Sequence, residues 1–168
     1  VGVYNVRLTT AETDNYEKGT ATVQFVIVPR QVGIEAVTVS DKIYDGTADA
    51  EITSNGSITN LVNGDDVTVV AGKANFSDKN VGTDKTVAFS GFALDGDDAA
   101  NYRLAGQPAS VTADISVKEI TINGTAVKNS RVYDGTTDAE ITDAGTPSEN
   151  YDGENLTIAA GNASYENK

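Results

Sequence analysis

The chain contains no cysteine, histidine, methionine or tryptophan, and only three of its 168 residues are proline. Without cysteine it forms no disulfide and offers no thiolate nucleophile or soft metal ligand. Without histidine it lacks the side chain that most often acts as a general base near neutral pH. Its serines and threonines have no basic partner other than lysine, and its glycines do not cluster as a phosphate-binding loop. We therefore predict that the protein is not an enzyme and carries no cofactor.

Basic residues are also scarce, because 12 lysines and arginines face 25 aspartates and glutamates, giving a formal charge of -13. Nucleic acid is excluded as a partner, since its phosphates need cationic side chains to displace counterions. No apolar run approaches the roughly 20 residues of a membrane span, so we predict no membrane insertion within this segment. High like-charge density keeps an extracellular chain soluble.

The apolar residues that are present suit β-structure. They are dominated by valine, isoleucine, alanine and leucine, with seven tyrosines and four phenylalanines, and branched and aromatic side chains fit a pleated, half-buried surface. Short segments alternate between apolar and polar residues, and none has the apolar spacing of a helix over three turns. This pattern predicts an all-β fold of tandem immunoglobulin-like β-sandwich modules, with β-grasp-like modules as the alternative. Residues 1–30 are predicted to be two strands joined by an acidic turn, and Asn55-Gly56 a hairpin turn.

One motif occurs twice. Tyr44-Asp45-Gly46-Thr47 returns as Tyr133-Asp134-Gly135-Thr136 at an offset of 89 residues, so the chain is a repeat protein. Further matches at the same offset pair Gly64, Gly72, Ala74 and Phe76 with Gly153, Gly161, Ala163 and Tyr165. We predict that each motif tyrosine buries its ring with a paired hydroxyl and that the aspartate and glycine form a turn. The alternative is a sugar contact, for which an exposed aromatic ring beside a carboxylate is suited.

The repeat divides the chain into three segments. Residues 31–118 are predicted to be a complete module, 119–168 the N-terminal part of the next module, and 1–30 the C-terminal part of another. The lengths of the two partial segments sum to about one module. The order of the segments is therefore that of a circularly permuted pair of modules, and we expect the chain to be an interior piece of a longer array. We expect a short linker at 29–34. We also expect Lys168 of one copy to approach Val1 of the next, through further covalent chain or by strand complementation.

An oxygen-rich loop at residues 95–101 raises the question of calcium. Carboxylates and amides at alternating positions can wrap a hard cation. The third position of this alternation is an alanine, and no glutamate completes a 12-residue loop. A solvated turn is the alternative interpretation. The candidate calcium ligands are Asp95, Asp97, Asp98 and Asn101.

Several stretches of the chain resemble the YDG-type repeat module of large bacterial surface proteins. They are the repeated Tyr-Asp-Gly-Thr motif, the Lys79-Asn80-Val81-Gly82 turn and the Asp95 to Tyr102 segment. Residues 1–28 resemble the end of the related MBG-type module and of bacterial immunoglobulin-like repeats. The resemblance implies a stalk or adhesive repeat of an extracellular, surface-anchored protein, with neighbouring copies as end-to-end partners and no catalytic residues. A glycan- or host-protein-binding module is the alternative, and its candidate aromatic contacts are Tyr4, Tyr16, Tyr102 and Tyr151.

Overall fold

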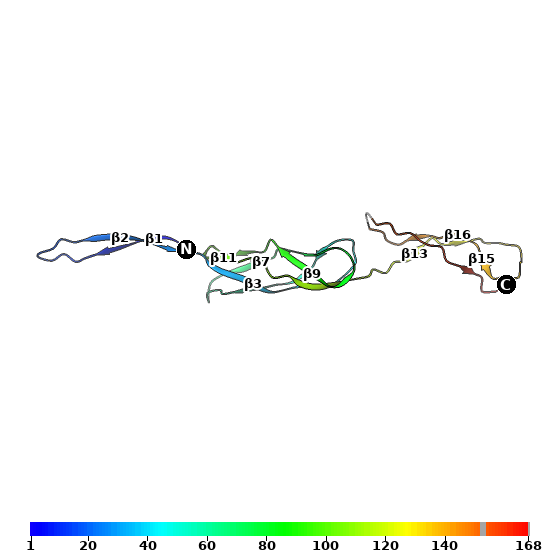
Figure 1. Cartoon of the computed structure of the whole chain (residues 1–168), viewed down its shortest axis with the longest axis horizontal. Helices are drawn as coiled ribbons and strands as arrows, with labels where there is room; N and C mark the ends of the chain where they lie inside the picture. The colour runs from blue at the N-terminus through cyan, green and yellow to red at the C-terminus, as the bar shows by residue number, and fades with distance from the viewer. Residues whose placement is uncertain (152–153, 168) are drawn as a thin grey trace.

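The computed structural model describes residues 1–151 and 154–167. Within these residues the regular structure consists of strands β1 to β18 and one short 3-10 helix, η1 (Ala99–Asn101). The predicted all-β fold is confirmed. Figure 1 shows the chain as three successive parts in a line: a free hairpin, a central module and a C-terminal segment. No helix in the described part of the chain is long and apolar enough to cross a membrane.

The N-terminal part is a single antiparallel hairpin of β1 (Gly2–Thr9) and β2 (Thr20–Ile27). Tyr4 lies opposite Phe25, and Val6 lies opposite Val23. The connecting turn is closed by an isolated bridge between Thr13 and Tyr16. Two strands joined by an acidic turn are therefore confirmed. No residue of 1–31 is buried, so this hairpin has no core of its own.

The central module contains three sheets. A five-stranded sheet has the order β4-β12-β9-β8-β5, a three-stranded sheet the order β11-β3-β6, and a two-stranded sheet pairs β10 with β7. Most pairs are antiparallel, but β11 lies parallel to β3, and β4 lies parallel to β12. The bounds of the first strands are β3 (Arg30–Val39), β4 (Lys42–Ile43), β5 (Asp49–Ala50), β6 (Ile52–Thr59) and β7 (Thr68–Val70). Those of the others are β8 (Lys73–Phe76), β9 (Gly82–Ser90), β10 (Ala93–Asp95), β11 (Tyr102–Leu104) and β12 (Val111–Ser116).

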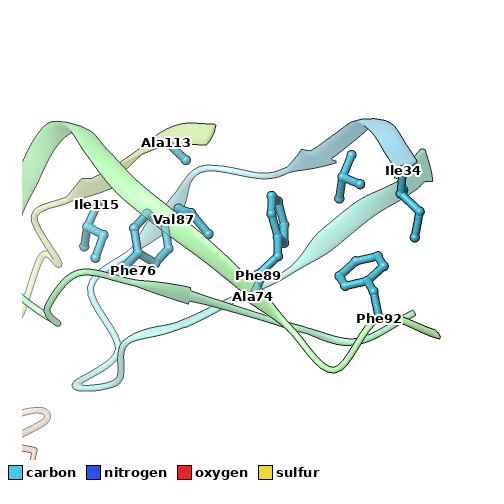
Figure 2. Close-up of a cluster of buried hydrophobic side chains, with 9 residues drawn as sticks. Ile34, Ala74, Phe76, Val87, Phe89, Phe92, Ala113 and Ile115 are labelled. Carbon is cyan, nitrogen blue, oxygen red and sulfur yellow. The ribbon is translucent and has the colours of Figure 1, made fainter. Parts of the chain in front are cut away.

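The core of the central module forms between the three-stranded and five-stranded sheets. Figure 2 shows side chains from both sheets directed into one cluster. The three-stranded sheet contributes Ile34 and Val37, and the five-stranded sheet contributes residues such as Val87 and Ile115, which are 0% and 1% exposed. The immunoglobulin-like sandwich and the β-grasp alternative both stay predictions.

Two local predictions are wrong in the central module. Asn55-Gly56 is not a hairpin turn, because it lies inside β6, where Gly56 takes a φ of +76° beside the Glu35 carbonyl of β3. Residues 29–34 are not a short linker between modules, because β3 begins at Arg30, and Val32 and Ile34 are buried in the core of the central module. In both places the backbone continues through sheet pairing where the local sequence signals an interruption.

The C-terminal segment repeats the pairings of the central module with shorter strands. Its strands are β13 (Ile122–Asn123), β14 (Ala126–Val127), β15 (Asp138–Ala139), β16 (Ile141–Asp143), β17 (Thr146–Pro147) and β18 (Ala163–Ser164). Asp138 pairs with Ser164 just as Asp49 pairs with Asn75, 89 residues earlier. No described residue from 116 to 167 is buried, so the strand pairs form without a closed core. Gly153 and Lys168, used in the sequence comparison, lie outside the described residues.

Candidate functional site: the duplicated turn and the module junction

A lysine holds the first Tyr-Asp-Gly-Thr turn together. The Lys42 Nζ donates hydrogen bonds to Asp45 Oδ1 at 2.8 Å, to the Thr47 carbonyl at 2.9 Å and to the Asp49 carbonyl at 2.8 Å. Asp45 Oδ1 also accepts from the Thr47 backbone N–H at 2.9 Å, and Gly46 supplies a φ of +80°. Aspartate and glycine are used here because a short acceptor and a positive φ are the two requirements of this turn.

The second turn has the same construction with arginine in place of lysine. The Arg131 Nη1 lies 3.0 Å from Asp134 Oδ2 and donates to Thr136 Oγ1 at 2.9 Å. Asp134 Oδ1 accepts from the Thr136 backbone N–H at 2.9 Å, and Gly135 has a φ of +82°. Arg131 lies 89 residues after Lys42 in the sequence. The repeat therefore includes a basic residue that the sequence analysis missed. The signal for it was a cation three residues before the aspartate in both copies.

Each cation also lies over an aromatic ring from the same position of the repeat. Lys42 Nζ is 5.5 Å from the centroid of the Phe76 ring, and the Arg131 guanidinium carbon is 5.3 Å from that of Tyr165. Such contacts favour a cation held at the ring face. In both copies, therefore, a cation lies between the carboxylate of the turn and an aromatic ring. In the central module this contact fixes the loop after β4 onto β8.

Both turn carboxyls are acidified by their surroundings. The hydrogen bond from Lys42 lowers the pKa of Asp45 from 3.8 to about 2, and the Thr47 backbone N–H adds to this shift. The pKa of Asp134 is lowered mainly by hydrogen bonds from the backbone and side chain of Thr136. Both groups are ionised at neutral pH as acceptors within a turn. This is a different property from the raised pKa that a general acid requires.

The two motif tyrosines differ in burial. Tyr44 packs partly buried against the core, and its backbone N–H donates to the Ser116 carbonyl of β12 at 2.9 Å. Tyr133 is 77% exposed, so its predicted burial is wrong. The reason is that the described part of the C-terminal segment has no counterpart of β12 to lie beside Tyr133. The predicted pairing of the hydroxyls is also wrong, since neither accepts or donates a hydrogen bond among the described residues.

The candidate calcium ligands are used within their own loop. Asp98 Oδ2 accepts from the Asp66 backbone N–H at 2.9 Å, and Asp95 Oδ1 accepts from the Gly96 N–H at 2.9 Å. Asn101 Oδ1 accepts from the amino group of Val1 at 3.3 Å, and Asp97 is exposed. Among residues 1–151 and 154–167, no group of three or more acidic side chains is placed to hold a metal ion. Calcium binding stays a prediction that this geometry does not support.

The four candidate sugar-binding tyrosines are not brought together. Tyr4 and Tyr16 lie in the hairpin and are 48% and 78% exposed. Tyr102 is only 7% exposed, and its hydroxyl donates to Asp65 Oδ2 and accepts from the Val62 N–H at 3.1 Å. Burial and the hydrogen bond to Asp65 raise the pKa of this hydroxyl. The prediction that Tyr102 is an aromatic contact for a ligand is therefore wrong, because its ring belongs to the core.

The fourth tyrosine joins two repeats. The Tyr151 ring packs edge-on against Tyr44, with ring centroids 5.6 Å apart, and lies close enough to Gly46 that a Cβ there would be 3.0 Å from it. Lys118 Nζ donates to the Tyr151 hydroxyl at 3.1 Å and lies 2.6 Å from Glu149 Oε2. The pKa of Lys118 is raised, first by Glu149 and then by Tyr151.

A second ion pair crosses the same junction, where Lys79 Nζ lies 2.9 Å from Glu154 Oε1. Between these contacts is a pocket of about 300 Å³ that is lined by Tyr44, Val81, Val117, Ile120, Tyr151 and Leu156. The first copy of the turn is thus in direct contact with the following repeat.

Together, the duplicated pairings and turns define a protein built from repeated all-β modules. The model of the YDG domain family matches residues 28–113, just over half of the chain, and the chain therefore belongs to that family. No curated protein and no solved structure matches it.

Replacing Lys42 by methionine is expected to lower the free energy of unfolding by about 1–3 kcal/mol at pH 7, because carbonyls beneath a side chain only 16% exposed lose their donor. K42R should retain most of the stability, since Arg131 performs the same role in the other copy. The folded pKa of Asp45 lies below its ordinary value, so its stabilising effect is complete above 3.8 and lost as the pH falls through about 2. The difference between K42M and wild type should shrink over that range. Urea unfolding at several pH values measures this, and a pH-independent difference would contradict it.

Proposed function

We propose that this protein is a structural and adhesive repeat segment of a bacterial extracellular or cell-surface fibre or stalk, associating end to end with further copies. The observation that carries the proposal is the junction, where Tyr151 of one repeat rests on the Tyr44 turn of the preceding repeat. The duplicated turn thereby has two roles, because it fixes a loop within its own module and provides a seat for the next one. Modules coupled to their nearest neighbours in this way form stiff linear arrays.

The composition supports a load-bearing role outside the cell. The chain is strongly acidic, with a net charge of -13, which disfavours unspecific association of its faces in a long array. Lys79–Glu154 and Lys118–Glu149 link successive repeats by charge, and the Tyr44–Tyr151 ring contact links them by apolar packing. These contacts couple the turn of one repeat to the repeat that follows it along the chain.

The proposed location is tested on cells of the bacterium that produces the protein. Antibodies raised against the purified chain are expected to label intact cells, and a protease added to the medium is expected to remove that signal. A cytoplasmic protein stained in parallel serves as the control for cell integrity. Labelling that appears only after the cells are permeabilised would contradict the proposal.

A second candidate function is the recognition of glycans or host proteins. It is favoured by Tyr16, whose ring is 78% exposed at the tip of the hairpin, in the same turn as the exposed residues Glu12 and Asp14. An exposed aromatic face with adjacent acceptors suits a sugar ring. The test is a glycan array probed with the wild-type chain and with Y16A. Specific binding that is lost in Y16A supports this function, and an equal signal from both proteins contradicts it.

A further inference from the structure

The central module has a pocket on its flank, at the point where the chain passes from one sheet to the other. β5 ends at Ala50 in the five-stranded sheet, and β6 begins at Ile52 in the three-stranded sheet. Beside this crossing lies a pocket of about 450 Å³, here called the flank pocket, whose lining residues come from 49–55 and 71–74. β5 pairs with β8 only at Ala74 and Asn75. Among the described strands, none therefore lies beside the edge of β8 at Lys73 on the pocket side.

The lining of the flank pocket is repeated more strictly than the rest of the module. Over residues 31–79, 16 of the 49 residues return unchanged after 89 positions, whereas six of the eight lining residues do so. The six are Asp49, Ala50, Ile52, Ala71, Gly72 and Ala74, which return as Asp138, Ala139, Ile141, Ala160, Gly161 and Ala163. These counterparts also line one pocket in the C-terminal segment. The flank pocket lies on the opposite edge of β8 from β9, so it persists where the β9 strand is present.

Core packing and backbone geometry explain part of this repetition. Ala74 is buried in the core, and Ile52 packs against it. Gly72 is required because a Cβ there would lie 2.0 Å from the Ser90 carbonyl oxygen of β9. These three positions therefore recur for the sake of the fold.

The fold does not explain the two exposed positions, Asp49 and Ala71. Asp49 Oδ1 accepts a hydrogen bond from Asn75 Nδ2 at 2.9 Å. Ser164 stands at the position of Asn75 in the second copy, so this hydrogen bond is not the reason that the aspartate recurs. An exposed carboxylate and an exposed small residue that recur together in a hollow indicate a binding role.

The polar side chains of the flank pocket both donate and accept hydrogen bonds. The Asp49 carboxylate accepts, the Lys73 ammonium group donates, and the Asn55 amide does both. The second copy has Asn162 in place of Lys73, which removes the positive charge and keeps an N–H donor. A ligand held by both copies therefore donates to the carboxylate and accepts at the position of Lys73, and it needs no charge of its own. Hydroxyl groups meet both requirements.

The shape of the flank pocket suits a small ring. Its volume of about 450 Å³ is within the range of small-molecule sites, about 300–1,000 Å³. Ala50 and Ala71 line it with methyl groups, which project so little that the C–H face of a ring can lie against them. An extended peptide fits less well, because the open edge at 71–73 is shorter than the strands of about five or six residues that usually pair in sheets. A neutral ring that carries several hydroxyl groups is a sugar.

We propose that the flank pocket binds one neutral sugar unit of a glycan, with Asp49 accepting from one hydroxyl, Lys73 donating to another, and Ala50 and Ala71 beneath the ring. This inference rests on glycan recognition as a function of the chain and gives it a site in each repeat. The flank pocket shares no residue with the junction at Tyr151, so it stays open when repeats follow one another. A row of weak sites along one chain binds a glycan-bearing surface tightly through avidity.

The site is tested by nuclear magnetic resonance of the ¹⁵N-labelled chain, titrated with methyl glycosides of neutral hexoses and N-acetylhexosamines. At least one of these glycosides is expected to shift the amide signals of Ala71, Gly72 and Lys73 at millimolar concentration. N-acetylneuraminic acid is expected to shift them less, because its carboxylate approaches that of Asp49. The inference is overturned if no neutral glycoside shifts these signals, or if the anionic sugar or an alanine pentapeptide shifts them as strongly.

Two substitutions with matched controls assign the binding to the flank pocket. A71L fills the pocket and is expected to abolish the shifts, whereas A88L, at an exposed alanine of β9, is expected to retain them. D49N is expected to weaken binding about tenfold or more through the loss of a charge-assisted hydrogen bond, and D97N, which removes the same charge from an exposed loop, is expected to leave it unchanged. Wild-type binding by both A71L and D49N overturns the inference. That failure leaves the surface labelling of cells and the Y16A comparison unaffected, so it is distinguishable from failure of the proposed function.

Discussion

Replacing Phe76 by alanine is expected to lower the free energy of unfolding of the central module by about 3–5 kcal/mol. Phe76 is 4% exposed, lies in the core between the two sheets, and supports Lys42 beneath the first Tyr-Asp-Gly turn. The substitution therefore removes a large apolar ring and the aromatic contact of the turn cation. Domains of this kind have a total stability of about 5–15 kcal/mol, so this loss is a large part of it. Urea unfolding followed by circular dichroism measures the change.

The matched control is Y165A, at the same position of the second repeat. The Tyr165 ring also lies beneath a cation, but it is half-buried and has no closed core around it. Its removal is expected to leave the unfolding of the central module unchanged. Similar losses in F76A and Y165A would contradict the assignment of the core to the central module alone.

Replacing Gly56 by alanine is expected to lower the free energy of unfolding by about 2–5 kcal/mol, combining left-handed strain with overpacking. Gly56 has a φ of +76°, and a Cβ there would lie 2.2 Å from the Glu35 carbonyl oxygen across the β3–β6 pair. Backbone cannot move aside as a flexible side chain does, so the two strands must separate locally. Thermal unfolding of G56A against the wild type measures the effect.

Gly64 offers a control that separates the two causes. It also has a positive φ, of +98°, but a Cβ there would meet nothing within 4 Å. G64A is expected to cost only the conformational strain, about 1–2 kcal/mol. If G56A and G64A are equally destabilised, the close approach of β3 and β6 at Gly56 is not the cause.

Local chemistry explains which predictions from sequence were correct. The alternation of apolar residues identified the two strands of the hairpin and the all-β character of the chain, because a period of two is a property of the strand itself. The Asp45-Gly46 turn was predictable for the same reason, since a short acceptor and a positive φ are needed within four residues.

Predictions failed where distant strands decide the outcome. Asn55-Gly56 has the chemistry of a hairpin turn, yet its positive φ serves a place where two paired strands approach closely. Tyr133 has the same neighbours in sequence as Tyr44, but burial of the ring depends on β12, which is far away in the chain. The role of Lys42 was missed because its value as a donor becomes visible only when three carbonyl and carboxylate acceptors converge on it.

The sequence alone determined that this is a repeated, acidic, all-β protein, because periodicity, charge and turn residues are local properties of the amino-acid sequence. Only the tertiary structure decided which copy of the repeat has a core, how Tyr151 seats one module on the next, and that residues 49–55 and 71–74 meet in the flank pocket. These properties depend on which strands meet across long stretches of chain. Such pairings are chosen by the burial of apolar surface in three dimensions, on which a local pattern has little influence.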